Sequence, residues 1–275
     1  MLEHDRNHPS IVIWSNGNEG GHNTDLDTLF HEYDPQQRPV IHPWHLFSDI
    51  QTQHYRQYNY GIGSYDYGRE ILMPTEFLHG WFDGGHGAGL EDYWEKMWYN
   101  PLGAGGFLWD FADNAVMRHD LNDSLDTDKF RAADGILGPH LEKEGSYYAI
   151  KEIWSPVHFE RREMTPMFDG KLWLENRYHY TNTNTCHFAW QLKRFDVNTI
   201  AEKHGFAKSP DIQPGAKGFV QLGLPGDWYD YDVLYVTVTD QYNQELFTWS
   251  FPISSPSRTG ARMIVKEGNS EIRHR

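Results

Sequence analysis

Short apolar runs alternate with longer mixed segments over the first half of the chain, and this alternation predicts its elements. Strand, loop and helix follow one another in the order typical of parallel βα units. The predicted helices include Thr24–Tyr33 and Gly89–Tyr99. The predicted strands are Ile11–Trp14, Arg38–Ile41, Asp49–Tyr55, Ile71–Phe77 and Gly105–Trp109.

The pattern changes from about Pro156 onward, where short alternating segments are broken by Asn, Gly, Pro and Asp. Such segments are typical of an antiparallel β-sandwich. They are KLWLENRYHYTN, HFAWQLKRF, KGFVQLGLP, VLYVTVTDQ and LFTWSFPI. We therefore expect an α/β domain over residues 1–154 and an all-β domain over residues 155–275.

Charge and composition narrow the range of functions. The formal net charge is −15, from 39 acidic against 24 basic residues, which argues against binding to nucleic acid or anionic lipid because both need a basic face. No apolar run approaches the roughly 18–20 residues of a membrane span. Aromatic residues make up 15% of the chain, and they suit either a large core or a cleft that stacks on sugar rings.

Two carboxylates lie at the ends of predicted strands. Glu19 comes just after the strand Ile11–Trp14, and Glu76 lies in the apolar run ILMPTE. In a parallel β/α architecture, functional side chains gather where the strands end. Glycoside hydrolases use a pair of carboxyl groups to cleave the glycosidic bond. Two glutamates after strands also arise by chance, so spacing alone leaves solvated strand-end carboxylates as an equal alternative.

Four segments of the first domain form a specific pattern in chain order: HDRNHPSIVIWSNGNEGGHN, DIQTQHY, MPTEFLHG and LGAGGFLWDFADNAV. The first resembles the acid/base segment of glycoside hydrolase family 2, the family of the large bacterial β-galactosidases. The second is similar to a sixth barrel strand that ends in tyrosine. The third resembles the nucleophile strand, and the last resembles the eighth strand.

The resemblance implies a role for each matching residue. Glu19 would be the acid/base and Glu76 the nucleophile of a reaction that retains the anomeric configuration. Four further residues would bind the sugar or hold the nucleophile: Asn18, Tyr55, His79 and Trp109. For the two aromatic residues, core packing is the alternative, and for the histidine an ordinary loop position is. The tyrosine alignment also leaves Tyr58 and Tyr60 open.

Histidines in the first domain raise the alternative of a transition-metal site. They are His22, His42, His45, His54, His79 and His86. A proline between His42 and His45 disfavours a helix, and no Cys or Asp cluster completes a site, so we predict no metal site in this chain. In the family's β-galactosidases, magnesium lies beside the acid/base, with other ligands from the preceding strand. Magnesium is therefore implied only for a full-length parent, through Glu19.

The resemblance places Glu19 on the fourth barrel strand and Glu76 on the seventh. It implies strands four to eight of a (β/α)8 TIM barrel, followed by an immunoglobulin-like β-sandwich, with N-terminal domains missing or supplied by a partner subunit. A partial barrel exposes two sheet edges, so we expect the isolated chain to be weakly active or inactive. The first residues contain no signal peptide, and the sequence leaves the compartment open.

The sequence thus predicts an exo-acting retaining β-glycosidase whose substrate carries a terminal β-D-galactosyl residue. Within the same family, β-glucuronidase and β-mannosidase are the alternative activities. The alternative from another class is a non-catalytic fragment or subunit of a larger glycosidase, which binds sugar or completes a partner chain.

Overall fold

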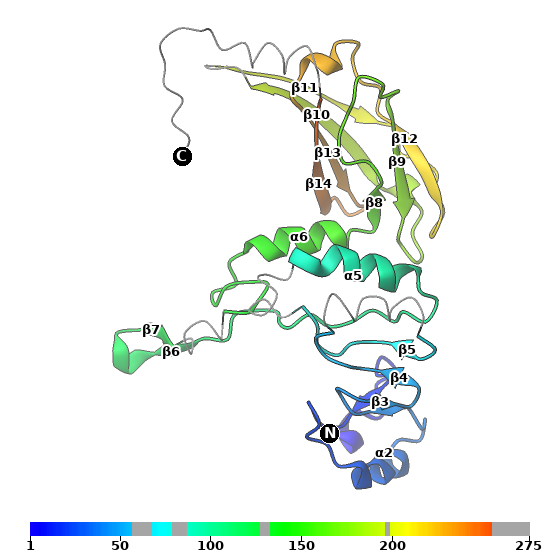
Figure 1. Cartoon of the computed structure of the whole chain (residues 1–275), viewed down its shortest axis with the longest axis vertical. Coiled ribbons are helices and arrows are strands. Elements are labelled where there is room, and N and C mark those ends of the chain that lie inside the picture. The colour runs from blue at the N-terminus through cyan, green and yellow to red at the C-terminus, as the bar shows by residue number, and fades with distance from the viewer. Residues whose placement is uncertain (57–67, 79–86, 127–132, 196–198, 255–275) are drawn as a thin grey trace. The chain divides into compact units, whose positions relative to one another are not determined.

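The computed structural model describes residues 1–56, 68–78, 87–126, 133–195 and 199–254, and the chain divides into units Met1–Ile153 and Trp154–Arg275 (Figure 1). The helices of the first unit are α1 (Leu2–Asp5), η1 (Thr24–Leu26), α2 (Asp27–Tyr33), α5 (Gly87–Tyr99), η2 (His119–Leu121) and α6 (Gly145–Ile153). Its strands are β1 (Trp14–Ser15), β2 (Val40–Ile41), β3 (Leu46–Phe47), β4 (Ile50–Gln51), β5 (Ile71–Leu72), β6 (Val116–Arg118) and β7 (Ser124–Asp126).

The sheets of the first unit contain both kinds of pairing: β3–β4 and β6–β7 are antiparallel, and two further pairs are parallel. Strand β1 pairs with β2, and β4 pairs with β5. Isolated parallel bridges continue the series at Leu72–Gly103, Phe77–Leu108 and Ala112–Leu137. The strands are much shorter than the apolar runs predicted, because a strand forms only where a neighbour supplies hydrogen bonds along its length. Among the described residues, these pairs do not close into a barrel.

Two helices and one strand-end segment share a core in the first unit. Helices α5 and α6 lie side by side (Figure 1), and Leu90, Tyr93 and Met97 fall at helical spacing on the buried face of α5. They pack with Ile150 of α6 and with Phe77, the residue after Glu76. This core therefore holds the backbone beside one predicted catalytic carboxylate.

None of the described helices combines the length and the apolar character needed to cross a membrane.

The second unit contains two antiparallel sheets. One has the order β11 (Ile200–Ala207), β10 (His187–Phe195), β13 (Val233–Thr239) and β14 (Glu245–Pro252). The other has the order β12 (Lys217–Gln221), β9 (Lys171–Asn176) and β8 (Val157–Phe159). The unit also contains the 3-10 turns η3 (Thr183–Thr185) and η4 (Trp228–Asp230).

One core joins the two sheets of the second unit. Leu174 and Val220 of the three-stranded sheet pack in the same buried cluster as Leu192, Val236 and Trp249 of the four-stranded sheet. Alternate residues of β13 are buried, as a strand with one face on a core requires. The sequence pattern did not indicate β11, because none of its side chains is fully buried. The immunoglobulin-like connectivity stays a prediction.

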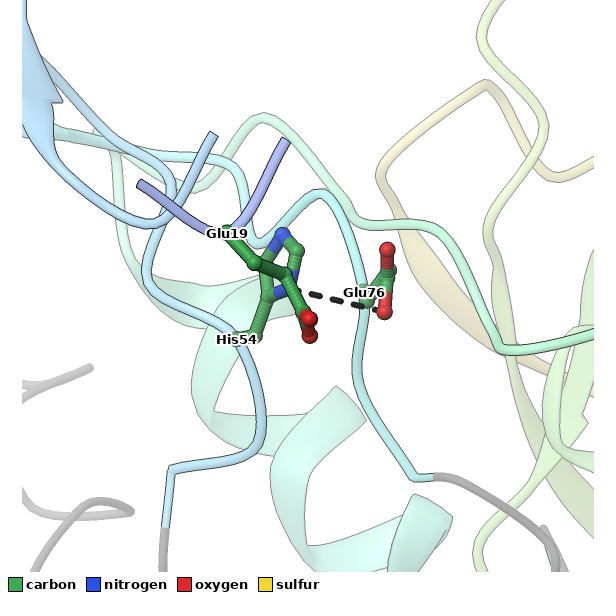
Figure 2. Close-up of side chains that lie close together, drawn as sticks. All are labelled: Glu19, His54 and Glu76. Carbon is green, nitrogen blue, oxygen red and sulfur yellow. Dashed lines mark ion pairs between the residues drawn. The ribbon is translucent and has the colours of Figure 1, made fainter. Parts of the chain in front are cut away.

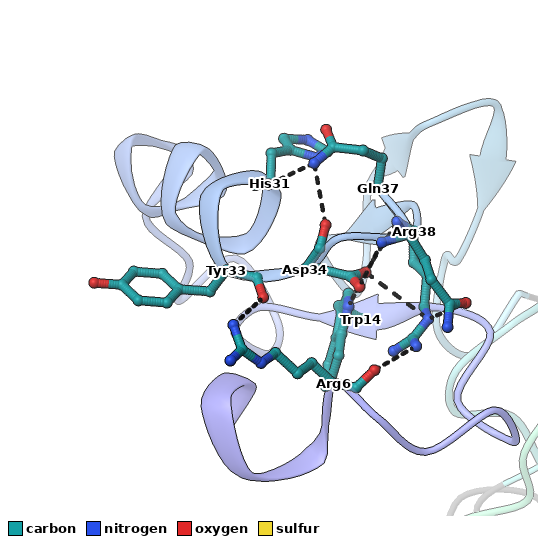
Figure 3. Close-up of polar contacts among 8 residues, drawn as sticks. Arg6, Trp14, His31, Tyr33, Asp34, Gln37 and Arg38 are labelled. Carbon is teal, nitrogen blue, oxygen red and sulfur yellow. Dashed lines mark hydrogen bonds and ion pairs between the residues drawn. The ribbon is translucent and has the colours of Figure 1, made fainter.

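A buried carboxylate connects the end of α2 to the strands beside it (Figure 3). Asp34 is 1% exposed, and its Oδ2 accepts from the Trp14 indole N–H at 2.9 Å and from the Arg38 backbone N–H at 3.0 Å. Its Oδ1 accepts from the Gln36 backbone N–H at 3.1 Å. Burial opposes ionisation, but these hydrogen bonds and the Arg38 charge outweigh it and lower the pKa of Asp34. Asp34 therefore fixes β1 against the turn that leads into β2.

The lowered pKa of Asp34 predicts how the stability of the fold depends on pH. A carboxyl with a depressed pKa stabilises the fold above its unfolded-state pKa, and that contribution is lost as pH falls through the folded-state pKa. We expect Asp34→Asn to lower the urea midpoint at neutral pH. The side-chain NH2 group of asparagine would replace a carboxylate oxygen and face N–H donors with which it cannot form hydrogen bonds. The variant should also lose less stability than the wild type between about pH 5 and pH 2.

Circular dichroism in urea at a series of pH values measures both effects. Asp49→Asn is the matched control, because Asp49 is exposed and has a positive φ of 61° that asparagine tolerates. Parallel pH profiles for the wild type and Asp34→Asn would contradict the role assigned to this carboxylate.

Candidate active site

The loop after β1 forms a tight turn that presents Glu19. Gly17 has a φ of +95°, and a Cβ there would lie 2.7 Å from the carbonyl oxygen of Gly21, so the position requires glycine. The Gly21 backbone N–H donates to the Asn18 carbonyl at 2.7 Å. Glu19 itself has a φ of 46°, a left-handed conformation that is uncommon for a residue other than glycine. The turn leaves the Glu19 side chain 47% exposed.

Glu76 lies on a segment with neighbours on both sides. Its carbonyl accepts from the Tyr55 backbone N–H at 3.3 Å, and the next residue, Phe77, donates to the Phe107 carbonyl at 3.0 Å. Phe77 is 2% exposed, so its side chain anchors the segment in the core. The Glu76 side chain is 13% exposed, and it is held more firmly than that of Glu19.

The side chains of Glu19 and Glu76 lie close to one imidazole, that of His54 (Figure 2). His54 Nδ1 lies 3.5 Å from Glu19 Oε1 and 3.4 Å from Glu76 Oε2. One ligand-type atom from each of the three residues lies within 4.8 Å of the other two. The His54 side chain is 1% exposed, so the imidazole is buried, whereas Glu19 is half exposed.

Tyr55 fixes the orientation of Glu76. Its hydroxyl donates to Glu76 Oε2 at 2.5 Å. Burial, followed by the hydrogen bond to Glu76 and the negative charges of Glu76, Glu19 and Asp134, raises the pKa of Tyr55 far above its usual value. The phenol therefore remains a hydrogen-bond donor at pH values at which an ordinary tyrosine is already ionised.

Of the three remaining predicted site residues, the structure describes Trp109 and Asn18. The backbone N–H of Trp109 donates to the Phe77 carbonyl at 3.3 Å, and its indole N–H donates to Asp134 Oδ2 at 3.1 Å. The Trp109 residue is 37% exposed. Asn18 has an exposed side chain on the turn beside Glu19. The last candidate, His79, lies outside the described residues.

Two residues at the cluster were not assigned a role from the sequence. His54 precedes Tyr55 directly, so its place on the strand-end segment DIQTQHY was a signal that it would lie near the nucleophile. Asp134 is buried and accepts from Trp109, and its charge acts on Tyr55. Its segment, DGILGP, contains no local pattern that points to the site, because tertiary contacts alone bring it there.

Magnesium does not suit the donor set beside Glu19. That ion, which the resemblance implies for a full-length parent, prefers near-octahedral oxygen coordination. In the described part of the chain, the one group with metal-ligand spacing provides the carboxylates of Glu19 and Glu76 and the nitrogen of His54. The chemistry proposed for the site therefore does not use magnesium.

Comparison with known proteins gives a family match for the half of the chain that contains the cluster. Residues 1–132 match the family model described as Glycosyl hydrolases family 2, TIM barrel domain. A β-galactosidase of Priestia megaterium is 28% identical over 257 residues, which cover 82% of this chain and 23% of that protein. A β-galactosidase of Yersinia pestis is 29% identical over 299 residues, which cover 94% of this chain and 28% of that protein.

The chain thus spans about a quarter of the length of these relatives, 23% and 28%. A solved exo-chitosanase of Amycolatopsis orientalis aligns with 92% of this chain and 37% of its own, at 12% identity. Its TM-score of 0.43 is too low to establish a common fold.

The raised pKa of Tyr55 gives a spectroscopic prediction. An ordinary tyrosine is mostly ionised at about pH 11, and its phenolate form then absorbs at a longer ultraviolet wavelength than the phenol. Because the Tyr55 phenol stays protonated, Tyr55→Phe should leave the phenolate absorbance of the folded chain at that pH unchanged. In concentrated urea, the burial and the contact with Glu76 are lost, and the variant should then show one phenolate fewer than the wild type.

The unfolded samples are the control for the size of one phenolate signal, and circular dichroism confirms that the alkaline samples are folded. A folded variant that already lacks one phenolate at about pH 11 would contradict the hydrogen-bonded arrangement of Tyr55 and Glu76.

Proposed function

Residues 1–132 belong to the TIM barrel domain of glycosyl hydrolase family 2, and on that premise we propose that the chain carries the catalytic pair of a retaining exo-β-glycosidase. The observation that carries this proposal is the meeting of Glu19 and Glu76, whose nearest ligand-type oxygens lie within 4.8 Å of each other. Retaining enzymes hold their carboxyl groups about 5–5.5 Å apart, whereas inverting enzymes need roughly 6.5–9.5 Å to admit water. The close approach of the two nearest oxygens is compatible with the shorter, retaining separation.

In the first step, Glu76 attacks the anomeric carbon while Glu19 protonates the leaving oxygen. The bond from the anomeric carbon to the leaving oxygen breaks as the bond to the Glu76 carboxylate forms, and the aglycone departs as an alcohol. The Tyr55 hydroxyl holds one oxygen of Glu76 at 2.5 Å. This hydrogen bond leaves the other oxygen free to turn toward the sugar.

In the second step, water replaces the enzyme at the anomeric carbon. Glu19, now ionised, accepts a proton from that water, the new carbon–oxygen bond forms, and the bond to Glu76 breaks. Each step inverts the anomeric centre, so the product has the configuration of the substrate. Glu19 ends protonated and Glu76 ends ionised, as at the start.

A terminal β-D-galactosyl residue is the substrate proposed for this site. Relatives named β-galactosidase support it, and the partly exposed Trp109 ring offers an apolar surface on which the C–H groups of a sugar can stack. We assign the sugar 2-hydroxyl to Asn18. β-Glucuronidase and β-mannosidase activity are the alternatives within the family, since both use the same two carboxylates.

The architecture proposed for the chain is strands four to eight of a TIM barrel, followed by an immunoglobulin-like sandwich. The coverage of about a quarter of each relative, 23% and 28%, supports a fragment. One specific observation favours the second candidate function, a non-catalytic subunit that completes a partner chain. The parallel pairs of the first unit remain open among the described residues, and open parallel edges can accept further strands.

The direct test is hydrolysis of nitrophenyl β-galactoside, β-glucuronide and β-mannoside by the 275-residue chain. We expect slow release from the galactoside, and Glu76→Gln should reduce it by at least about a hundredfold because the nucleophile is lost. Glu19→Gln should mainly slow the second step, since nitrophenolate leaves without a proton. Azide, which needs no general base, should then restore turnover of Glu19→Gln.

Glu32→Gln is the control, because Glu32 is an exposed carboxylate on α2. A 2-fluoro-galactosyl fluoride serves as a second readout, since a covalent adduct on Glu76 can be detected by mass even when turnover is very slow. A folded chain that neither hydrolyses a nitrophenyl glycoside nor forms the adduct would contradict the catalytic proposal and favour the non-catalytic subunit.

A further inference from the structure

We propose that Glu19, His54 and Glu76 together bind one divalent transition-metal ion of the zinc type. The three side chains come from segments far apart in the sequence, and the structure brings one ligand-type atom of each within 4.8 Å of the others. Two of these residues are the proposed catalytic carboxylates. An ion at this position would therefore be an inhibitor of the site rather than its cofactor.

The hydrogen bonds of His54 determine which of its ring nitrogens can bind an ion. The Thr75 hydroxyl donates to the Thr52 carbonyl at 3.3 Å, so its lone pairs face His54 Nε2, which lies 2.8 Å from the Thr75 oxygen. Nε2 therefore carries the proton and donates. In the neutral ring, Nδ1 is then left with a lone pair, which is the form that a metal ligand requires.

That lone pair points at two carboxyl groups. His54 Nδ1 is buried and has no hydrogen-bond partner, and the nearest oxygens of Glu19 and Glu76 face it at 3.5 Å and 3.4 Å. Three electron-rich atoms around one point repel one another unless a cation lies among them. The arrangement calls for a proton, on Nδ1 or on Glu19, or for a metal ion among the three atoms.

The distances favour a metal ion over a proton. An N–H···O hydrogen bond spans about 2.7–3.2 Å, and a charge-assisted one is shorter still. Ligands about 2.0–2.2 Å from a tetrahedral ion lie roughly 3.4 Å from one another. The two separations from Nδ1, 3.4 Å and 3.5 Å, match the edge of such a tetrahedron. The three ligands leave a fourth position for water.

The surroundings of His54 resemble those of a metal-binding imidazole. Such rings donate their second nitrogen to a fixed acceptor, which sets the tautomer and the ring orientation, and Thr75 provides that acceptor here. Trp44 stacks on the His54 ring, with ring centres 5.9 Å apart and an angle of 1° between the planes. A mixed oxygen and nitrogen donor set also suits zinc and its neighbours in the periodic table better than magnesium.

The other histidine cluster in the described part of the chain is a poorer candidate. The ring centre of His22 lies 4.7 Å from that of His42 and 5.2 Å from that of His45. Both nitrogens of His42 are already engaged, with the Asn16 carbonyl at 2.9 Å and with Asp27 Oδ2 at 2.8 Å. His42 therefore has no lone pair to offer without losing a buried hydrogen bond.

Isothermal titration of the 275-residue chain with zinc chloride tests the site without any assay of activity. We expect one zinc ion per chain, and a loss of at least about tenfold in affinity for His54→Gln, Glu19→Gln and Glu76→Gln. Glutamine at position 54 can still reach Thr75 but offers no ring nitrogen to the ion. His119→Gln is the matched control, because His119 is exposed and pairs with Asp123 outside this cluster.

Zinc affinity that is unchanged in all three variants, or a folded wild-type chain that binds no zinc, would overturn the proposal. In the second case a proton shared by the three residues takes the place assigned to the ion. Cobalt(II) gives an independent readout, since tetrahedral coordination by these side chains produces a visible absorption band that His54→Gln should remove.

The inhibitory effect rests on the proposed function, and the two can fail separately. If the chain hydrolyses the nitrophenyl galactoside, zinc should inhibit it with the affinity measured by calorimetry, and EDTA should restore the rate. Zinc binding without hydrolysis in EDTA would leave the metal site standing and count against the glycosidase. Hydrolysis that zinc does not affect would leave the glycosidase standing and overturn the metal site.

Discussion

The mutual repulsion of two carboxylates around a buried imidazole is the constraint on which the site depends. Oxygens of Glu19 and Glu76 lie within 4.8 Å of each other, with His54 Nδ1 3.4–3.5 Å from both. Such a pair is stable only if charge is offset and the geometry is held from outside. The Tyr55 hydroxyl contributes by donating to Glu76, and the metal ion proposed for this cluster would supply the positive charge.

The backbone of the first unit holds this geometry through parallel neighbours. The Tyr55 N–H donates to the Glu76 carbonyl, and the Trp109 N–H donates to the Phe77 carbonyl, so three strand-end segments lie side by side. Glu19 and Tyr55 both have left-handed backbone conformations, with φ of 46° and 43°. Residues other than glycine adopt this conformation at a cost, and it persists where the surroundings fix it, as they do at functional sites.

The open sheet edges of the first unit are the structural feature that supports the proposal of a fragment, since the matched family has a TIM barrel domain. In a closed barrel, every strand has hydrogen-bonded partners on both sides. Among the described residues, the first unit has parallel strands with no partner on one side. The second unit buries its apolar side chains within itself, because its two antiparallel sheets share one core. The proposed chemistry and the open sheet edges among the described residues therefore both belong to the first unit.

Local patterns determined most of what could be predicted from the sequence. Helical spacing in the segment ending at Tyr99 predicted α5, and alternation predicted β13, because side-chain periodicity depends only on neighbouring residues. The motifs around Glu19 and Glu76 led to the family. Strand lengths were wrong, since they depend on a partner strand. The tertiary structure alone placed His54 between the two carboxylates and brought Asp134 to the Trp109 indole, because these contacts join segments that the chain sequence separates and only folding brings together.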